Sequence, residues 1–280
     1  MAYPTVSAPY GLEPINLIGS QVFAGGVRQL PIQYNYATAI FNGDFVVLSR
    51  GNITRATVET GTGVNQVTGV FVGCSYTDPN TKQKTFNQYY PGSVTAGDIM
   101  AYVVEDPDTV FKVAVCSSGT TIASGNPALI GTNGSFINNA GNANTGNSRN
   151  AFLAPSDTPA STILPARVID VVPDTAYSFT ATGSSSSTTI TLTGSGAPQA
   201  IPVGTAVSYV ASNGQLIQTG SFVDTAAAVG ATSVTLNAAI AVPGAITAIP
   251  SASTIVFTVY PEILVKVNLL IHGYYSSATA

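Results

Sequence analysis

The segment FNGDFVVLSRGNITRA, residues 41–56, carries the pattern of a β-hairpin. Phe45 and Val47 would lie on one face of its first strand, because successive side chains of a strand point to opposite faces. The tetrapeptide Ser49-Arg50-Gly51-Asn52 separates the two strand-like stretches and has the composition of a chain reversal. The segment therefore predicts a strand, a turn and a second strand.

Strand patterns recur along the rest of the chain, whereas no long segment repeats apolar residues at helical spacing. The clearest are GVFVGCSY (69–76), DIMAYVVED (98–106), TVFKVAVC (109–116) and EILVKVNLLI (262–271). In the last of these, one face would carry Ile263, Val265, Val267, Leu269 and Ile271. We therefore expect an all-β fold, with a main domain that is a β-barrel or a β-sandwich.

The sharpest change in composition begins near residue 175. Between Thr175 and Pro261 the only charged residue is Asp224, and Asn213-Gly214 gives a strong hairpin signal there. The flanks, ILPARVIDVVPD before this block and VYPEILVKVNLLIHGYY after it, look like strands of the more charged first region. An insertion between neighbouring strands is tolerated because the two ends of a domain usually lie close together.

These patterns divide the chain into three expected parts. Residues 1–18 form an extended N-terminal arm, and residues 19–174 together with 259–280 form the main β domain. Residues 175–258 form an inserted, small β-sandwich-like domain. The Gly- and Asn-rich segment 119–150 is expected to be a long surface loop with room for short strands.

Composition restricts the classes of partner. Charged residues make up 8% of the 280 residues, against roughly 25% in average globular proteins. The net charge is −4, with nine basic and thirteen acidic residues, whereas neutralising phosphates needs clustered Lys and Arg, which argues against nucleic acid as a partner. The N-terminal residues lack the pattern of a secretory signal, and no run of about 18 apolar residues occurs, so we expect no membrane partner.

Groups that could perform chemistry are few. The single histidine, His272, has no companion for a catalytic triad or a histidine metal site, and we interpret it as a surface or interface residue. The motif Glu105-Asp106-Pro107-Asp108 could offer carboxylates to calcium, but it is also ordinary turn chemistry. We expect no enzymatic activity, no cofactor and no metal. Cys74 and Cys116 are interpreted as buried free thiols, with a disulfide as the alternative.

One cluster combines basic and aromatic residues. Its members are Lys82, Lys84, Phe86, Tyr89 and Tyr90. The cluster is too short and isolated for binding of single-stranded nucleic acid. Two interpretations stay open: a contact surface for another protein, where Tyr and Phe are enriched, or a loop whose aromatic rings cover the core of the main domain.

Four segments resemble capsid decoration (cement) proteins of tailed phages, especially phages of cyanobacteria and marine bacteria. They are MAYPTVSAPYGLEPINLIGSQVFAGGVRQLPI (1–32), YATAIFNGDFVVL (36–48), GVFVGCSYTDPNTKQKTFNQYYPG (69–92) and DIMAYVVEDPDTVFKV (98–113). The resemblance covers about residues 1–174 and 260–275. It implies a non-enzymatic virion protein on the outer surface of the head, often a homotrimer, which stabilises contacts between subunits of the major capsid protein.

The resemblance also implies contact residues, since members of the family often bind the shell through an extended N-terminal arm. The matching segment here is 1–18, and its candidate contact residues are Tyr3, Pro4, Pro9, Tyr10 and Pro14. The prolines would keep the segment extended. The alternative function is a host-surface or glycan-binding adhesion or fibre component of the virion, with the insert as its binding part.

Overall fold

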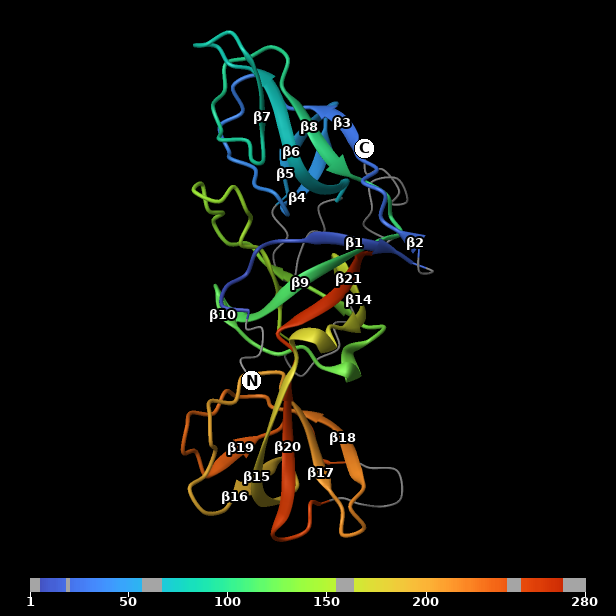
Figure 1. The fold of residues 1–280 in the computed structure, drawn as a ribbon, viewed down its shortest axis with the longest axis vertical. Helices are drawn as coiled ribbons and strands as arrows, with labels where there is room; N and C mark the ends of the chain where they lie inside the picture. The colour runs from blue at the N-terminus through green and yellow to red at the C-terminus, as the bar shows by residue number, and fades with distance from the viewer. Residues whose placement is uncertain (1–5, 19–20, 57–66, 155–163, 241–247, 269–280) are drawn as a thin grey trace.

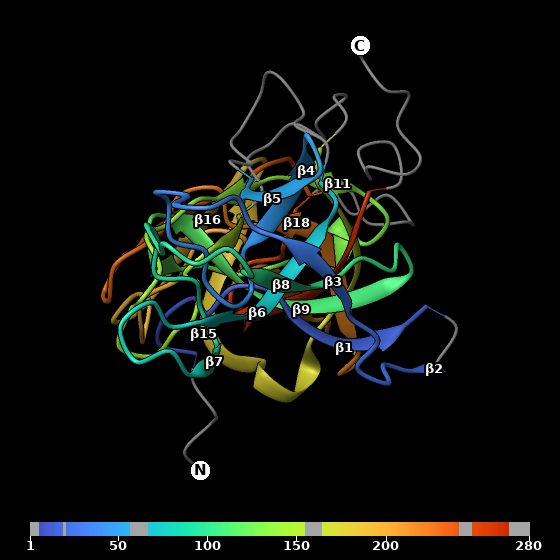
Figure 2. The same cartoon turned by 90° about the horizontal axis from the view of Figure 1, so that it is seen from above.

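The computed structural model describes residues 6–18, 21–56, 67–154, 164–240 and 248–268, and over them the protein is all-β. Three sheets follow one another along the long axis of the molecule: a first sheet, a central sheet and an insert sheet (Figure 1). Viewed down this axis, the first sheet lies over the central sheet (Figure 2). The predicted all-β class is confirmed, and the architecture is sandwich-like rather than a closed barrel.

The first sheet is antiparallel, with the order β3-β8-β6-β4-β5 and with β7 paired to β6. Its strands are β3 (Arg28–Pro31), β4 (Phe45–Ser49), β5 (Asn52–Arg55), β6 (Gly69–Thr77), β7 (Lys84–Asn87) and β8 (Met100–Val104). The predicted hairpin is confirmed as β4 and β5. Arg50 and Gly51 at its turn both have positive φ, 50° and 82°, a combination that matches the twist of two-residue hairpins.

The central sheet has the order β11-β14-β21-β9-β1-β2, with further short strands beside β9. Its strands are β1 (Glu13–Leu17), β2 (Gln21–Val22), β9 (Thr109–Ser118), β10 (Thr121–Ile122), β11 (Asn133–Gly134), β12 (Phe136–Ile137), β13 (Ala151–Leu153), β14 (Ala166–Val171) and β21 (Glu262–Val267). All its pairs are antiparallel except β13 with β9. On β21 the predicted apolar face is confirmed for Ile263, Val265 and Val267, which are buried. Leu269 and Ile271 lie outside the described residues.

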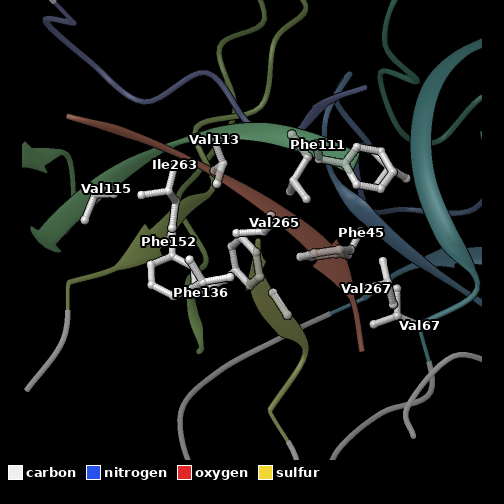
Figure 3. Packing of buried hydrophobic residues seen from close by; sticks show 14 of the residues in the cluster. Phe45, Val67, Phe111, Val113, Val115, Phe136, Phe152, Ile263, Val265 and Val267 are labelled. Carbon is white, nitrogen blue, oxygen red and sulfur yellow. The ribbon is translucent and has the colours of Figure 1, made fainter. Parts of the chain in front are cut away.

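The first and central sheets share one core (Figure 3). The ring of Phe136 packs edge-on against Phe45 of β4, with ring centres 4.7 Å apart, and against Phe152 of β13 at 5.7 Å. Phe45 and Val47 face this core, as predicted, while Val46 between them faces a second core on the other side of the first sheet. Strand β4 is therefore buried on both faces at its start.

The segment that forms the insert sheet lies between β14 and β21 in the sequence. These two strands pair with each other in the central sheet. The order of the insert sheet is β18-β17-β20-β15-β16-β19. The strands are β15 (Tyr177–Ser186), β16 (Thr189–Leu192), β17 (Ala206–Val210), β18 (Leu216–Phe222), β19 (Ser233–Thr235) and β20 (Ser253–Val259). They enclose a separate apolar core that includes Ile190, Tyr209 and Phe257. Within the described residues, the two helical turns are 3₁₀ turns, η1 (Pro127–Leu129) and η2 (Pro173–Thr175).

The insert contacts the central part of the molecule directly. The amide of Ser124 donates a hydrogen bond of 2.8 Å to the carbonyl of Val203 in the insert. Gly204 follows with φ +83°, and a Cβ atom there would lie 1.9 Å from the Ser124 carbonyl oxygen. Only glycine fits this position, since both the backbone conformation and the space exclude a side chain.

Two expectations about the first half of the chain are corrected. Segment 119–150 is not a surface loop throughout, because it contains η1, β10, β11 and β12 and buries Ser124, Asn126, Ser148 and Asn150. Its Ser and Asn side chains form hydrogen bonds with backbone groups, which makes a buried irregular segment tolerable. The described part of the expected arm is not separate from the main domain, because β1 pairs with β9 of the central sheet and Leu12 is buried.

Candidate functional site

The basic and aromatic cluster lies on and beside the β6–β7 hairpin at one end of the molecule (Figure 1). Its turn is built by Asp78, whose Oδ1 accepts hydrogen bonds from the amides of Asn80 at 2.7 Å and Thr81 at 3.1 Å. The amide of Lys82 donates to the Asp78 carbonyl at 2.9 Å, and Lys82 takes a positive φ of 61°. Asp78 therefore acts as turn chemistry, as the sequence predicts.

The members of the cluster have different environments. Phe86 on β7 is 71% exposed, although its backbone is held opposite Ser75 of β6. Lys82 is exposed, and Nζ of Lys84 forms a 2.9 Å ion pair with Asp98. Tyr89 is half-buried and its ring stacks on Phe41, with centroids 5.2 Å apart. The accessible part of the cluster is therefore Phe86 with the two lysines.

Tyr90 corrects the interface interpretation of this cluster. Its side chain is fully buried in the second core, its hydroxyl donates to the Tyr36 carbonyl at 2.8 Å, and the hydroxyl oxygen accepts from the Val94 amide at 3.3 Å. No partner can reach this ring in the folded protein. For Tyr90, the interpretation in which an aromatic ring completes the protein's own core is the right one.

Two candidate contact residues of the N-terminal segment, Tyr10 and Pro14, are held by the central sheet. Pro9 is buried, Pro14 lies in β1, and the Tyr10 hydroxyl donates to the carboxylate of Glu262 on β21. Burial raises the pKa of Tyr10, and the hydrogen bond to Glu262 raises it further, so the hydroxyl stays a donor at neutral pH. Tyr3 and Pro4, like His272, lie outside the described residues.

Sequence reasoning missed a buried ionic network centred on Asp44, just before β4. The Asp44 carboxylate is fully buried, and its Oδ2 lies 2.9 Å from Nε of Arg55. Its Oδ1 accepts from the Ser148 hydroxyl at 2.6 Å and from the Asn150 amide at 3.1 Å. Burial raises the pKa of Asp44, while Arg55 and the hydrogen bonds oppose that shift. The signal was the Gly43-Asp44 pair directly before a buried apolar strand.

This network joins parts of the chain that are far apart in sequence. Arg55 ends β5 of the first sheet and also donates through an Nη atom to the Asn139 carbonyl at 2.9 Å. Ser148 and Asn150 belong to the segment that packs against the central sheet. The carboxylate is enclosed and saturated by protein donors, so it serves to fix the two sheets together rather than to act on a ligand.

The other side chains that could bind a metal ion or take part in catalysis do not form a common site among the described residues. Within the part of the chain that the structure describes, no three His, Cys, Asp or Glu residues are placed to hold a metal ion. Asp106 caps its own turn by accepting from the Asp108 amide at 2.9 Å, in line with the turn interpretation of that motif. Over the same residues, no helix has the length and apolarity needed to cross a membrane. No protein-family model, curated protein or solved structure matches this chain.

The two thiols are free and buried, so the disulfide alternative is wrong. Burial raises the pKa of Cys74 to about 12 and that of Cys116 to about 11. Since the thiolate is the reactive form, we expect neither thiol of the native protein to react with an aromatic disulfide reagent at neutral pH. Both should react at once in denaturant. Prompt reaction of one native thiol would contradict the burial of that residue.

The pH dependence of stability should have a contribution from Asp98. The Lys84 ammonium and the amide and hydroxyl of Thr77 donate to its carboxylate at 2.8–2.9 Å and hold the pKa of Asp98 well below its ordinary value of 3.8. A carboxyl whose folded pKa is lowered stabilises the fold above its unfolded pKa, and this contribution is lost as pH falls through the folded pKa. We expect thermal stability to fall below about pH 4 more steeply in the native protein than in Asp98→Asn.

The matched control for this measurement is Asp174→Asn. The Asp174 side chain is exposed and has no hydrogen bond to another described residue. Melting temperatures of the three proteins from about pH 5 to about pH 2 make the comparison. Parallel curves for the native protein and Asp98→Asn would show that the contacts of Asp98 do not contribute to folding.

Proposed function

We propose that this chain is a non-enzymatic structural protein of a phage virion. It binds the outer surface of the head as a homotrimer and stabilises contacts between subunits of the major capsid protein. The observation that carries the proposal furthest is Phe86, an aromatic side chain that is 71% exposed on a strand already held by hydrogen bonds. Aromatic residues are enriched among those that dominate binding energy at protein interfaces.

The geometry of the hairpin favours a contact role for Phe86. Its strand is paired, so binding would not have to order a flexible segment, and this removes one of the entropic costs of association. Lys82, in the turn that precedes β7, is exposed and offers positive charge to a partner surface, whereas Lys84 is paired with Asp98. The hairpin is at the end of the molecule away from the insert, so one end can contact the shell while the insert projects from it (Figure 1).

The low content of charged residues is compatible with a protein that is present in many closely packed copies. The chain has nine basic and thirteen acidic residues among 280, and several of them are committed to ion pairs such as Arg55 with Asp44 and Lys84 with Asp98. Neighbouring copies at high density would therefore repel one another weakly. A trimer would also cover strand edges that are otherwise open to aggregation.

The test measures binding to purified heads that lack this protein. We expect the native protein to sediment with them, and Phe86→Ser to bind at least about tenfold more weakly, because aromatic anchors at interface centres commonly contribute this much. The matched control is Val229→Ser, which replaces a 67% exposed apolar residue of the insert. It should bind as the native protein does, and both variants should keep the native melting temperature.

Two outcomes would count against the proposal. Equal binding of Phe86→Ser and the native protein would remove Phe86 from the interface. Recovery of the native protein with tails or host cells, and not with heads, would reject head decoration in favour of an adhesion or fibre component. The mass of the protein in solution, measured by light scattering, tests the homotrimer separately.

A further inference from the structure

The outer face of the insert sheet carries an array of hydroxyl groups. Along β15, successive outward positions are Ser178, Thr180, Thr182 and Ser184. The intervening residues Phe179 and Ala181 pack on the insert core, which fixes the direction of the hydroxyl-bearing side chains.

Strand register continues these hydroxyls across the sheet. Ser184 lies opposite Thr191 of β16, and Thr191 lies opposite Ser233 of β19. In the next row, Thr182 lies opposite Thr254 of β20. Neighbouring hydroxyls are thus about 4.8 Å apart across strands and about 6.7 Å apart along them. The result is a two-dimensional lattice rather than scattered polar residues.

Most of these hydroxyls are available to a ligand. Ser178, Thr180, Thr182, Thr191 and Thr254 are exposed. Ser178 bonds to Thr258 at 2.9 Å, but the hydroxyls of the other four make no hydrogen bond to another described residue. Threonine is stiff at χ1, so each such hydroxyl is held in few orientations before a ligand arrives. Each can donate and accept.

The absence of charged residues on this face indicates which class of ligand it can bind. Asp224 is the only charged residue between Thr175 and Pro261, and the strand register places none on the outer face described above. Such a face offers no attraction to an anionic polymer. Its apolar side chains flank the hydroxyls: the row of Thr182 and Thr254 continues through Val210 of β17 to the exposed Leu216 of β18. A ligand with many neutral hydroxyls complements it best. We propose that the outer face of the insert sheet binds a neutral polysaccharide. The extended sugar chain would lie across several strands of the sheet.

The strength of single contacts predicts what kind of sugar binds. A hydrogen bond formed in exchange for bonds to water gains little, so a monosaccharide would be held too weakly to detect. A long or insoluble polymer presents many repeats to the lattice at once, and several copies on one particle would add to the effect. This inference goes beyond head decoration, since it concerns the opposite end of the molecule.

The test uses the full chain and its depletion from solution by insoluble polymers. The neutral probes are microcrystalline cellulose, agarose and curdlan, and the anionic probe is calcium alginate gel. The variant is Thr182→Val/Thr191→Val/Thr254→Val, which removes three hydroxyls and keeps β-branched side chains. The matched control, Thr38→Val/Thr121→Val/Thr225→Val, removes three exposed hydroxyls outside the array.

We expect retention on at least one neutral polymer, little changed between low and high salt, with at least a tenfold loss in the array variant and none in the control. Equal retention of the two triple variants, retention on alginate alone, or no retention of the native protein on any neutral polymer would overturn the proposal. A change in solution mass of the array variant would also overturn it, because the face would then join copies of this chain. Head binding of the same variant should stay native, which separates this test from the one on Phe86.

Discussion

Replacing Asp44 with alanine should lower the free energy of unfolding by about 3–5 kcal/mol, the range found when one partner of a buried ion pair is removed. The carboxylate is fully buried and accepts from Arg55, Ser148, Asn150 and the Phe41 amide. Its loss would leave a partly buried guanidinium without its counter-charge and two side-chain donors without their acceptor. Urea unfolding followed by circular dichroism measures the change.

The double variant Asp44→Ala/Arg55→Ala sharpens this prediction. Removal of both charges leaves no uncompensated ion, so the double variant should be less destabilised than the sum of the two single variants. Asp174→Ala, at an exposed position, is the control and should change stability by less than about 0.5 kcal/mol. An additive cycle, or a cost under about 1 kcal/mol for Asp44→Ala, would show that the network does not fix the sheets together.

The pH response of this network should differ from that of Asp98. Burial raises the pKa of Asp44, so the folded state binds this proton more tightly than the unfolded state does. Protonation of Asp44 on acidification therefore does not by itself favour unfolding. Acid sensitivity should follow carboxyls such as Asp98, whose pKa is lowered in the fold.

The fold could be predicted from sequence where the signals are local. The β4–β5 hairpin and the buried face of β21 follow from alternation and from turn residues within a few positions. The pairing of β1 with β9 joins residues almost 100 positions apart, and no short pattern encodes it. The turn at Asp106 was also predicted, but the strands on either side of it, β8 and β9, belong to different sheets.

Segment 119–150 shows why composition misled. Its Gly, Asn and Ser residues are typical of surface loops. In the structure, small polar side chains satisfy backbone groups inside the molecule: the Ser124 hydroxyl accepts from the Tyr260 amide at 2.9 Å, and Asn126 accepts from the Ala128 amide at 2.8 Å. Burial of such a segment depends on partners elsewhere in the chain, which a single sequence does not identify.

The candidate site could be predicted only in part, because the direction of each side chain also depends on partners elsewhere in the chain. The pattern of residues 82–90 indicates an aromatic cluster but does not say which rings point outward. Alternation along β7 exposes Phe86, while the chain beyond the strand turns Tyr90 into the core. The core-covering interpretation is therefore right for Tyr90, while a contact role for the exposed Phe86 stays a prediction.

Tyr90 gives the second large expected effect. Tyr90→Ala should lower the free energy of unfolding by about 3–5 kcal/mol, because it opens a cavity where a large aromatic side chain was fully buried. Tyr90→Phe keeps the ring but leaves the Val94 amide and the Tyr36 carbonyl without the hydroxyl, and it should cost about 1–3 kcal/mol. Phe86→Ala, with an exposed ring, should change stability by less than about 0.5 kcal/mol.

The order of these three variants separates core from surface on one short segment. In urea unfolding, the loss in the free energy of unfolding should be largest for Tyr90→Ala, smaller for Tyr90→Phe and smallest for Phe86→Ala. Head binding, measured below the temperature at which any variant unfolds, should rank them differently, with Phe86→Ala the weakest. If Tyr90→Ala kept native stability and lost only head binding, Tyr90 would be an interface residue and its burial in the second core would be wrong. Because the two measurements rank the same residues in opposite orders, a general loss of folding cannot imitate the loss of a contact surface.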